Sequence, residues 1–346
     1  MKILLSAGEA SGDRIGAALA RALREIDPSL ELAGCAGPEM VRAGVRPLAR
    51  AEDFAHSGWS SVLRHLPRLV RGAARYFREA DLFRPRAVVA LDAPGLNTPL
   101  LRRFEHLDPA RTWVAPPQLW AWRDRRPAVL DGLHTHPLHA FEVPAQLAVG
   151  ARAQWFGFPG LRPERAPGPR DLVALFPGSR KAWRNRHAAL FLEAARLAVP
   201  HLTPVFAALD AAPGTTEIGV PSLPPDQVLS RAALALALPG TATLEIALQG
   251  IPAVVAARPT RLDAWIARRR LADGALALPN RILARTVFPE FASPSLRPSD
   301  LGSALRRAAA LEGREPALDG FRELLGPDAA AERIARGVLE RIRPDP

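Results

Sequence analysis

Short apolar runs alternate with longer segments of helical periodicity along most of the chain, and this alternation constrains the fold more than any other feature. The apolar runs that indicate strands cover residues 2–6, 30–34, 87–91, 111–115, 154–157, 172–176, 203–207, 234–238 and 253–256. Strands that alternate with helices predict parallel βαβ units, and nearly continuous apolar strands are typical of sheets covered on both faces. The sequence therefore predicts an α/β fold with parallel sheets.

A segment rich in proline and glycine, residues 161–170, divides this pattern into two halves, because helix and sheet both tolerate such a composition poorly. We predict a first Rossmann-like lobe over residues 1–162 and a second over 170–325. A terminal helix within 326–346 is expected to pack back on the first lobe. The helix candidates are residues 14–24, 62–77, 98–104, 187–197, 243–248 and 301–310.

Composition sets limits on the class of protein. A length of 346 residues suits two domains, and 48% hydrophobic residues indicate a globular protein. No stretch approaches the roughly 18 apolar residues that span a bilayer. The single cysteine, Cys35, excludes an intramolecular disulfide and a zinc-type cysteine cluster, and it favours a reducing compartment such as the cytoplasm. His134, His136 and His139 have no carboxylate at a convincing ligand spacing, so they are interpreted as loop or core residues and no metal site is predicted.

The net charge of +11 attracts anionic surfaces, whether phosphate, nucleic acid or acidic lipid, without choosing among them. Part of it lies on residues 59–78, where five arginines fall on one helical face and apolar residues line another. This basic amphipathic pattern favours contact with a membrane, although an ordinary helix with a solvated face shows the same pattern. Pro67 is expected to limit a long regular helix here. The five arginines are Arg64, Arg68, Arg71, Arg75 and Arg78.

The segment of residues 6–14, Ser-Ala-Gly-Glu-Ala-Ser-Gly-Asp-Arg, lies between the first strand and the first helix. Small residues let a backbone approach a ligand closely, and the start of a helix presents unpaired N–H groups. Ligands of open α/β sheets bind at the carboxyl ends of strands. The pattern alone fits equally well a tight turn in which Ser11 or Asp13 caps the helix.

The full string at residues 7–13, Ala-Gly-Glu-Ala-Ser-Gly-Asp, resembles the N-terminal signature of the lipid-A-disaccharide synthase family. Further segments resemble motifs of that family in the same order, and together they cover about residues 2–290. They are Ala-Gly-Pro-Glu-Met (36–40), Leu-Asp-Ala-Pro-Gly-Leu-Asn (91–97), Ala-Pro-Pro-Gln-Leu-Trp-Ala-Trp-Arg (115–123), Ala-Phe-Glu (140–142), Phe-Gly-Phe-Pro (156–159), Leu-Phe-Pro-Gly-Ser-Arg (175–180), Pro-Gly-Thr-Ala-Thr-Leu-Glu (239–245) and Leu-Pro-Asn-Arg-Ile-Leu-Ala-Arg (278–285).

This resemblance implies a GT-B fold, with two Rossmann-like lobes and an active site in the cleft between them. It implies an inverting, metal-independent and cofactor-free transfer of 2,3-diacylglucosamine from UDP to 2,3-diacylglucosamine 1-phosphate (lipid X). The products are lipid A disaccharide 1-phosphate and UDP. The implied partners are a UDP-sugar donor, a glycolipid acceptor and the anionic inner face of the cytoplasmic membrane. A homodimer is a further option, and no nucleic acid partner is expected.

Asp92 is the residue that we expect to act in catalysis. An inverting transfer needs a base that takes the proton of the attacking acceptor hydroxyl, and Asp92 directly follows the strand at 87–91. The alternative is an aspartate that caps the turn before Pro94. Glu9 is the second catalytic candidate, as a group that positions a sugar. The residues expected on the acceptor side are Gly8, Ser11, Gly12, Asp13, Asn97, Gln118 and Trp120.

The donor side is expected in the second lobe. Backbone amides and a guanidinium at Gly178, Ser179 and Arg180 would suit the UDP diphosphate, although a surface turn with a solvated arginine fits the same residues. Glu245 would accept the ribose hydroxyls, or it is favoured only by the helix dipole in the first turn. The remaining donor candidates are Gly240, Thr241, Thr243, Asn280 and Arg285.

Several positions depart from the family pattern, and they keep two alternatives open. Gly95 replaces an aspartate, Phe158 replaces a histidine, an acidic residue is missing from residues 181–185, and the single tyrosine is Tyr76. One alternative is a GT-B transferase that uses another UDP-sugar and acceptor. The other is a non-catalytic homologue that binds anionic lipid.

Overall fold

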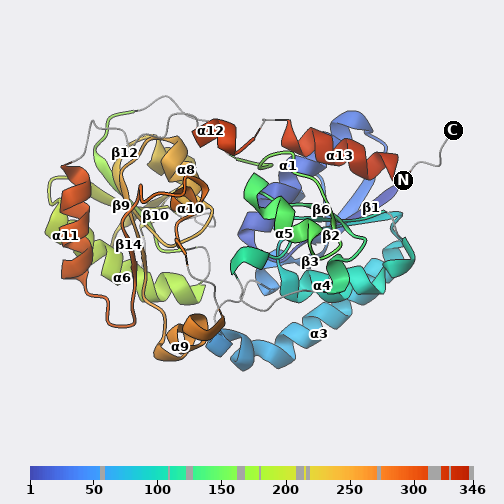
Figure 1. Cartoon of the computed structure of the whole chain (residues 1–346), viewed down its shortest axis with the longest axis horizontal. Coiled ribbons are helices and arrows are strands. Elements are labelled where there is room, and N and C mark those ends of the chain that lie inside the picture. The colour runs from blue at the N-terminus through green and yellow to red at the C-terminus, as the bar shows by residue number, and fades with distance from the viewer. Residues whose placement is uncertain are drawn as a thin grey trace. The chain divides into compact units, whose positions relative to one another are not determined.

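The computed structural model of the chain describes residues 1–54, 59–107, 110–121, 128–161, 168–178, 181–207, 214–215, 219–270, 274–310, 321–326 and 329–342. The chain divides into two compact units (Figure 1). Unit 1 comprises Met1–Leu161, Arg270–Ala272 and Glu323–Pro346, and unit 2 comprises Arg162–Arg269 and Asp273–Arg322. Most of the segment predicted as a linker, residues 162–167, lies outside the described residues.

Unit 1 is built on a parallel sheet with the strand order β3-β2-β1-β4-β5-β6-β7. Its strands are β1 (Lys2–Ala7), β2 (Glu31–Ala36), β3 (Arg46–Arg50), β4 (Ala87–Leu91), β5 (Arg111–Val114), β6 (His134–His136) and β7 (Arg152–Ala153). Every residue of β4 is buried, as are most of β1 and β2, because helices cover both faces of the sheet.

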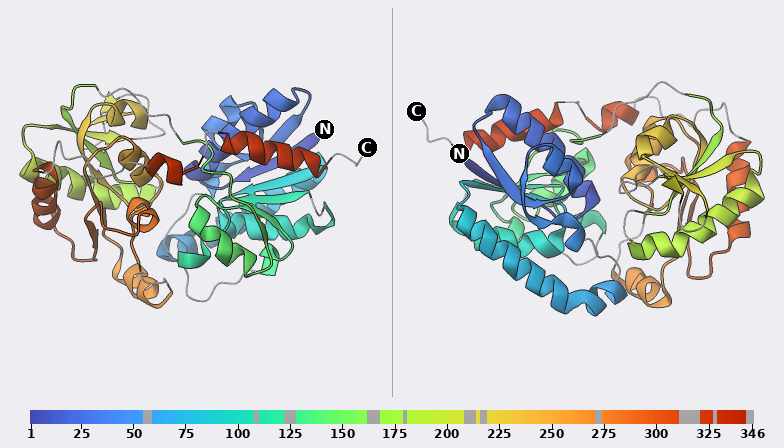
Figure 2. Two further views of the ribbon diagram at one scale, coloured as in Figure 1. Left: turned by 45° about the horizontal axis from the view of Figure 1, so that its top comes forward. Right: turned by 180° about the vertical axis from the view of Figure 1, so that it is seen from behind.

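The helices of unit 1 form a layer on each face of this sheet (Figures 1 and 2). Helices α3 (Trp59–Phe83) and α4 (Pro94–Arg103) pack through Tyr76, Phe83 and Leu100 on one face. Helix α1 (Ala10–Ile26) covers the other face and packs against the terminal helix α13 (Ala330–Glu340). The shorter helices are α2 (Pro38–Arg42) and α5 (Val143–Leu147), with 3-10 turns η1 (Ala51–Asp53), η2 (Glu105–Leu107), η3 (Leu119–Ala121), η4 (Ala128–Leu130) and η5 (Ala140–Glu142).

Unit 2 has a second sheet with the order β10-β11-β9-β8-β12-β13-β14, parallel except for the β10–β11 pair. The strands are β8 (Leu172–Phe176), β9 (Thr203–Ala207), β10 (Gly214–Thr215), β11 (Pro221–Leu223), β12 (Ala232–Ala237), β13 (Ala253–Ala257) and β14 (Glu290–Ala292). The helices are α6 (Lys181–Ala198), α7 (Pro225–Leu229), α8 (Ala242–Leu248), α9 (Arg261–Arg270), α10 (Leu278–Ile282) and α11 (Pro298–Ala309), and α12 (Phe321–Leu324) leads back to unit 1.

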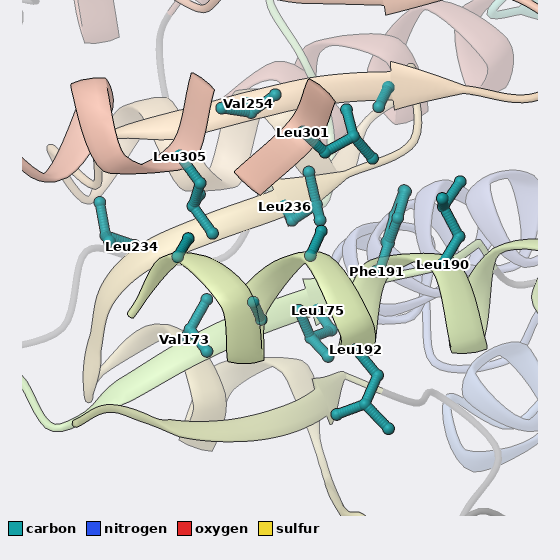
Figure 3. Packing of buried hydrophobic residues seen from close by; sticks show 14 of the residues in the cluster. Val173, Leu175, Leu190, Phe191, Leu192, Leu234, Leu236, Val254, Leu301 and Leu305 are labelled. Atoms are coloured by element: carbon teal, nitrogen blue, oxygen red, sulfur yellow. The ribbon is translucent and has the colours of Figure 1, made fainter. Parts of the chain in front are cut away.

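The core of unit 2 lies between its sheet and the helix pair α6 and α11. Figure 3 shows Leu175 and Leu236 of the sheet pointing at Phe191 and Leu301 of the two helices. All four side chains are fully or almost fully buried. The apolar strands predicted from the sequence thus owe their composition to burial on both faces.

The sequence predicted most elements. His136, in β6, and His139 are buried, so they are core residues, one of the two options given for these histidines. Two expectations were wrong. Residues 154–157 are not a strand: the last strand of this sheet is β7, after which the Gln154 N–H donates to the Thr135 carbonyl oxygen at 2.9 Å. Helix α3 runs through Pro67 to Phe83, because its stripe of buried residues continues along the sheet beyond the single N–H that the proline lacks.

Each sheet has one point at which the strand order reverses. In unit 1 it lies between β1 and β4, and in unit 2 between β8 and β12. Connections that leave two such neighbouring strands run to opposite sides of the sheet, so a crevice forms at their carboxyl ends, and open α/β sheets bind ligands there. In unit 1 the segments at this point are residues 8–13 and 92–97. In unit 2 the described residues at this point are 177–178 and 238–245.

Candidate functional site

Asp92 has an unusual backbone conformation directly after β4. Its φ angle is +52°, and that of the next residue, Ala93, is +45°. Residues with a Cβ atom rarely adopt the left-handed region, and each such residue costs on the order of 1–3 kcal/mol unless its surroundings impose it. Strain of this kind clusters at functional sites, and the structure holds it here at the residue that the sequence analysis proposed as the base.

Three hydrogen bonds hold the Asp92 main chain. Its N–H donates to the Val114 carbonyl oxygen at 3.0 Å, and its own carbonyl oxygen accepts from Asn97 Nδ2 at 2.8 Å and from Trp113 Nε1 at 3.2 Å. Asn97 and Trp113 are both fully buried. The amide group of Asn97 also donates to the carbonyl oxygens of Ser6 at 3.1 Å and Leu91 at 3.2 Å, so this residue joins the ends of β1 and β4.

The Asp92 carboxylate points toward the turn that opens α1. Its Oδ2 atom accepts a hydrogen bond from Ser11 Oγ at 2.9 Å, and both side chains are half-buried. Glu9 lies two residues earlier, half-buried, in extended conformation at the start of α1. The structure therefore brings together three of the residues predicted for this side, and it leaves the Asp92 carboxylate partly open to solvent as a general base requires.

Two other predicted residues in the opening turn allow close packing. A Cβ atom on Gly8 would lie 2.7 Å from Ala93 Cβ, and one on Gly12 would lie 3.0 Å from the Leu91 carbonyl oxygen. These glycines let α1 approach the end of β4, which places Ser11 beside Asp92.

Asp13 is buried and its carboxylate is occupied within the fold. It accepts backbone N–H groups from Gly37 at 2.9 Å, Glu39 at 2.9 Å and Met40 at 3.0 Å, all at the start of α2. In this arrangement Asp13 anchors the α2 turn to α1. Asp13 would therefore affect acceptor binding only by holding the α2 turn in place, because its carboxylate is already bonded to that turn.

Glu142 is a residue of this site to which sequence reasoning gave no role. It is 6% exposed, and its carboxylate accepts Trp120 Nε1–H at 2.6 Å and the His139 N–H at 3.2 Å. Burial, opposed by these hydrogen bonds and assisted by the charge of Asp92, raises the pKa of Glu142 to about 7. The Ala-Phe-Glu segment was visible as a family motif, but nothing in the sequence linked it to Trp120.

The remaining acceptor candidates lie on the loop after β5. Trp120 is half-buried in η3, and Gln118 is exposed two residues earlier. Trp122, which was weighed as part of an acceptor wall, lies outside the described residues, whereas Trp113 is buried and supports Asp92.

In unit 2, two glycines flank the reversal point. Gly178 follows β8 with φ +95°, and a Cβ atom there would lie 2.6 Å from Leu238 Cδ1. Gly240 has φ +151°, and a Cβ atom added there would meet no heavy atom of the described residues within 4 Å. The backbone at Gly240 is therefore accessible to a ligand. Ser179 and Arg180, predicted for the diphosphate, lie outside the described residues.

Residues of α8 complete this segment. Thr241 precedes the helix and is half-buried, Thr243 Oγ1 donates to the Gly240 carbonyl oxygen at 2.7 Å, and Glu245 is 4% exposed. Thr243 thus fixes the Gly240 turn with its hydroxyl group. Glu245 lies in the first turn of α8.

Asn280 is a buried structural centre of unit 2. Its amide nitrogen donates to the Phe288 carbonyl oxygen and to Glu290 Oε1, both at 2.7 Å, and its amide oxygen accepts the N–H groups of Val287 and Phe288, both at 2.8 Å. These bonds fold the chain after α10 back toward β14. Arg285 lies exposed on the segment so held, and its N–H donates to the Asn280 carbonyl oxygen at 3.1 Å.

His187 joins α6 to the segment that follows β13 in unit 2, and the sequence analysis gave it no role. It is fully buried, its Nδ1 lies 2.9 Å from the Trp183 carbonyl oxygen, and its Nε2 accepts the Arg258 N–H at 2.7 Å. Burial lowers its pKa to about 4, so it is a neutral ring with Nδ1 as the donor. It links the first turn of α6 to the segment that follows β13.

Within the described part of the chain, no group of three His, Cys, Asp or Glu side chains is arranged to hold a metal ion.

Comparison with known proteins places these segments in a family. The family model described as lipid-A-disaccharide synthetase matches residues 3–161 and 164–312. The lipid-A-disaccharide synthase of Thiobacillus denitrificans is 34% identical over 338 residues, which cover 88% of this chain and 91% of that protein.

Solved structures with low sequence identity share the fold. The glycotransferase of kitacinnamycin is 15% identical with a TM-score of 0.62 and covers 99% of both chains. S. aureus MnaA, solved with UDP, is 12% identical with a TM-score of 0.62 and covers 100% of this chain and 98% of its own. The fold is therefore of the GT-B type, with two Rossmann-like units. On the family match and the identity over most of its length, the chain belongs to the lipid-A-disaccharide synthase family of hexosyltransferases.

Proposed function

We propose that the chain transfers 2,3-diacylglucosamine from UDP to lipid X, with Asp92 as the general base, and releases lipid A disaccharide 1-phosphate and UDP. The observation that carries this proposal is the Asp92 carboxylate at the reversal point of the unit 1 sheet. Buried groups hold the Asp92 backbone in a strained conformation. Its Oδ2 atom accepts a hydrogen bond from Ser11. The family to which the chain belongs supports the choice of substrates.

The step requires one proton transfer and one bond exchange. As the acceptor hydroxyl oxygen attacks the anomeric carbon, Asp92 takes its proton, and the bond to the UDP oxygen breaks on the opposite side. The Ser11 hydroxyl donates to Oδ2, which orients the carboxylate and leaves its other oxygen for the acceptor. The configuration at the anomeric carbon is inverted because a single displacement takes place.

The donor side of the proposal lies in unit 2. We assign the UDP-sugar to the segments that carry Gly178, Gly240, Thr241, Thr243, Glu245 and Arg285, and Asn280 supports this site by holding the segment of Arg285. Ser179 and Arg180, which lie outside the described residues, are kept as the candidates for the diphosphate. Support comes from the open space at Gly240, from the fold shared with MnaA, which was solved with UDP, and from the donor that the family uses. The leaving diphosphate carries negative charge, which suits a segment of backbone amides and arginine.

A panel of donors and acceptors tests the substrate assignment. The wild-type protein is expected to release UDP from UDP-2,3-diacylglucosamine only when lipid X is present. UDP-N-acetylglucosamine or an unacylated acceptor should give less than a tenth of that rate, because acyl contacts contribute binding energy that they lack. Faster release from another pair would replace these substrates. If no pair reacts while anionic vesicles still bind, the chain is a non-catalytic lipid-binding homologue.

Membrane contact through α3 is a second part of the proposal. Exposed Arg68, Arg71 and Arg75 lie on the side opposite the buried stripe, and Val70 (59% exposed) and Leu82 (70%) add exposed apolar surface. Exposed arginines together with exposed apolar side chains match an anionic membrane surface, to which charge and apolar burial both contribute binding. No helix in the part of the chain that the structure describes is long and apolar enough to span a bilayer.

Substitution of Arg68, Arg71 and Arg75 by serine tests this contact. Each arginine near an anionic bilayer contributes about 1 kcal/mol, so binding to phosphatidylglycerol vesicles is expected to weaken roughly 100-fold. Sedimentation with vesicles measures this. The control removes three exposed arginines elsewhere, Arg196, Arg307 and Arg333. An equal loss in the control would show that net charge, and not α3, directs the binding.

A further inference from the structure

The Trp120 indole is held by a buried acid from a different part of the chain. Glu142 Oε1 accepts Trp120 Nε1–H at 2.6 Å, and the two residues are 22 positions apart. Glu142 comes from η5, after β6, and Trp120 comes from η3, after β5. The pair therefore ties together the two connections that leave neighbouring strands of the unit 1 sheet at their carboxyl ends.

The described part of the loop that carries Trp120, residues 115–121, is fixed at three points. Its first residue, Ala115, has φ +53° and donates its N–H to the His136 carbonyl oxygen at 3.0 Å. Buried Gln146 holds the next point, because its Nε2 donates to the Pro117 carbonyl oxygen at 3.1 Å. Glu142 holds the third point, Trp120. Such anchoring of a half-exposed segment is typical of a binding surface that must keep its shape.

Two aromatic rings of this region form a continuous surface. Phe141 packs edge-on against Trp120, with ring centroids 5.9 Å apart and planes at 63°, and it is 39% exposed. Buried His139 stacks on Phe141 at 5.5 Å with nearly parallel planes. The exposed sides of Phe141 and Trp120 are large, rigid and apolar, which matches the C–H face of a pyranose ring.

The surface follows the strand next to that of the proposed base. Strand β4 pairs with β5, and the Asp92 N–H donates to the Val114 carbonyl oxygen at 3.0 Å, so Asp92 and the loop that carries Trp120 leave neighbouring strands at the same edge of the sheet. The charge of Asp92 also acts on Glu142, and His139 lies in the same turn as Glu142. His139 has a pKa lowered to about 4 by burial, so it is neutral at physiological pH.

We propose that Glu142 is a positioning residue for the acceptor: it holds Trp120, so that Trp120 and Phe141 present one aromatic wall on which the acceptor sugar ring stacks beside Asp92. This inference rests on the proposed function for the identity of the acceptor. Glu142 touches Trp120 and not the substrate, so its effect is on acceptor binding. The wall belongs to unit 1 alone, and donor binding should not depend on it.

Protonation of Glu142 couples the wall to pH. Its pKa of about 7 lies above the usual value for glutamate, so the neutral acid dominates below pH 7 and the carboxylate above it. The carboxylate is a stronger acceptor for the Trp120 indole N–H than the neutral acid, so the ionised form holds the wall more firmly. The acceptor kcat/KM is therefore expected to rise as pH rises through about 7.

Four variants test the inference: Glu142→Gln, Glu142→Ala, Trp120→Phe and the Trp120→Phe/Glu142→Ala pair. Glutamine keeps an acceptor for the indole and stays neutral, so it should leave the acceptor KM within a few-fold of wild type and abolish the rise of acceptor kcat/KM through pH 7. Alanine and phenylalanine should each raise the acceptor KM about tenfold, the effect of one buried hydrogen bond, while the donor KM stays unchanged. Glu25→Ala, an exposed glutamate on α1, is the matched control.

The double variant separates positioning from general damage. If both substitutions break one bond, the pair should be no worse than either single change, whereas independent effects would multiply. Equal rises in donor and acceptor KM, multiplication in the double variant, or a rise of acceptor kcat/KM through pH 7 that persists in Glu142→Gln would each overturn the inference.

A measurement that needs no turnover keeps this result apart from the substrate assignment. The Trp120 indole N–H, assigned in NMR spectra by its loss in Trp120→Phe, should exchange slowly in wild type and Glu142→Gln and rapidly in Glu142→Ala. Fast exchange in the wild type would overturn the positioning role even if no substrate pair reacts. Slow exchange without any turnover would instead count against the proposed function and leave the Trp120–Glu142 bond established.

Discussion

Asp92→Asn is expected to lower kcat by roughly 10²–10⁴-fold, the usual contribution of a general base. Asparagine keeps the shape of the side chain and an oxygen that accepts from Ser11, and it tolerates the left-handed conformation at φ +52° better than most residues. It cannot take a proton from the acceptor hydroxyl. Initial rates at saturating donor and acceptor give kcat, and both KM values should change little.

Ser11→Ala provides a graded comparison for Asp92. It removes the hydrogen bond to Oδ2 and leaves the carboxylate in place, so a loss of about tenfold is expected, which corresponds to one hydrogen bond to a charged group. An Asp92→Asn protein with wild-type kcat would remove the proposed base. A large loss in Ser11→Ala beside an unchanged Asp92→Asn would move the chemistry to the opening turn.

Asn97→Ala is expected to have the largest effect on the structure of the site. The substitution deprives three buried carbonyl oxygens, on Ser6, Leu91 and Asp92, of their donor. An unsatisfied buried group costs about 1–3 kcal/mol, so a local loss near the upper end of this range is expected. The strained backbone at residues 92–93 would also lose one of its restraints, so activity should fall together with stability.

Hydrogen-exchange mass spectrometry is the suitable measurement, because two units need not unfold in one step. Peptides that cover residues 88–100 should lose protection in Asn97→Ala, while peptides from β8 and β12 should not. Ser230→Ala, which removes an exposed hydrogen bond to the Gln227 carbonyl oxygen, serves as the comparison. Full protection of residues 88–100 in Asn97→Ala would show that Asn97 does not hold Asp92.

The elements that sequence analysis predicted best are those whose composition follows from burial. Strands β4 and β8 were predicted at their observed ends because they consist of uninterrupted, fully buried apolar residues. Strand β9 was also predicted at its observed ends, although its first residue, Thr203, is polar and exposed. The strands that it missed lie toward the edges of the sheets and are short or polar. Strand β3 reads Arg-Pro-Leu-Ala-Arg and β14 reads Glu-Phe-Ala, and only pairing with a neighbour identifies them as strands.

The site was predicted where a motif and a strand end coincide. Asp92 and Ser11 are 81 residues apart, and the parallel pairing of β1 with β4 brings them together, as expected of two strand ends in one sheet. Glu142 and His187 were missed because their partners are set by packing. Glu142 reaches Trp120 through a turn that no periodicity predicts, and His187 bridges a helix and the segment after a strand.

Some candidate residues proved to serve the fold directly. Asp13 and Asn280 use their polar atoms for backbone groups of their own unit, and Gly8 and Gly12 provide close packing. A motif found in a family thus contains residues that shape a site as well as residues that act in it. Which of the two a residue does is decided by the partners of its side chain, and a sequence does not contain that information.

The configuration of the product made by the wild-type protein tests the central claim most directly. UDP-2,3-diacylglucosamine and lipid X are incubated with the protein, and the new glycosidic bond is examined by NMR spectroscopy. Direct displacement assisted by the Asp92 base predicts a disaccharide 1-phosphate whose anomeric configuration is opposite to that of the donor. A product with the donor's configuration, or the absence of any disaccharide, would contradict the account.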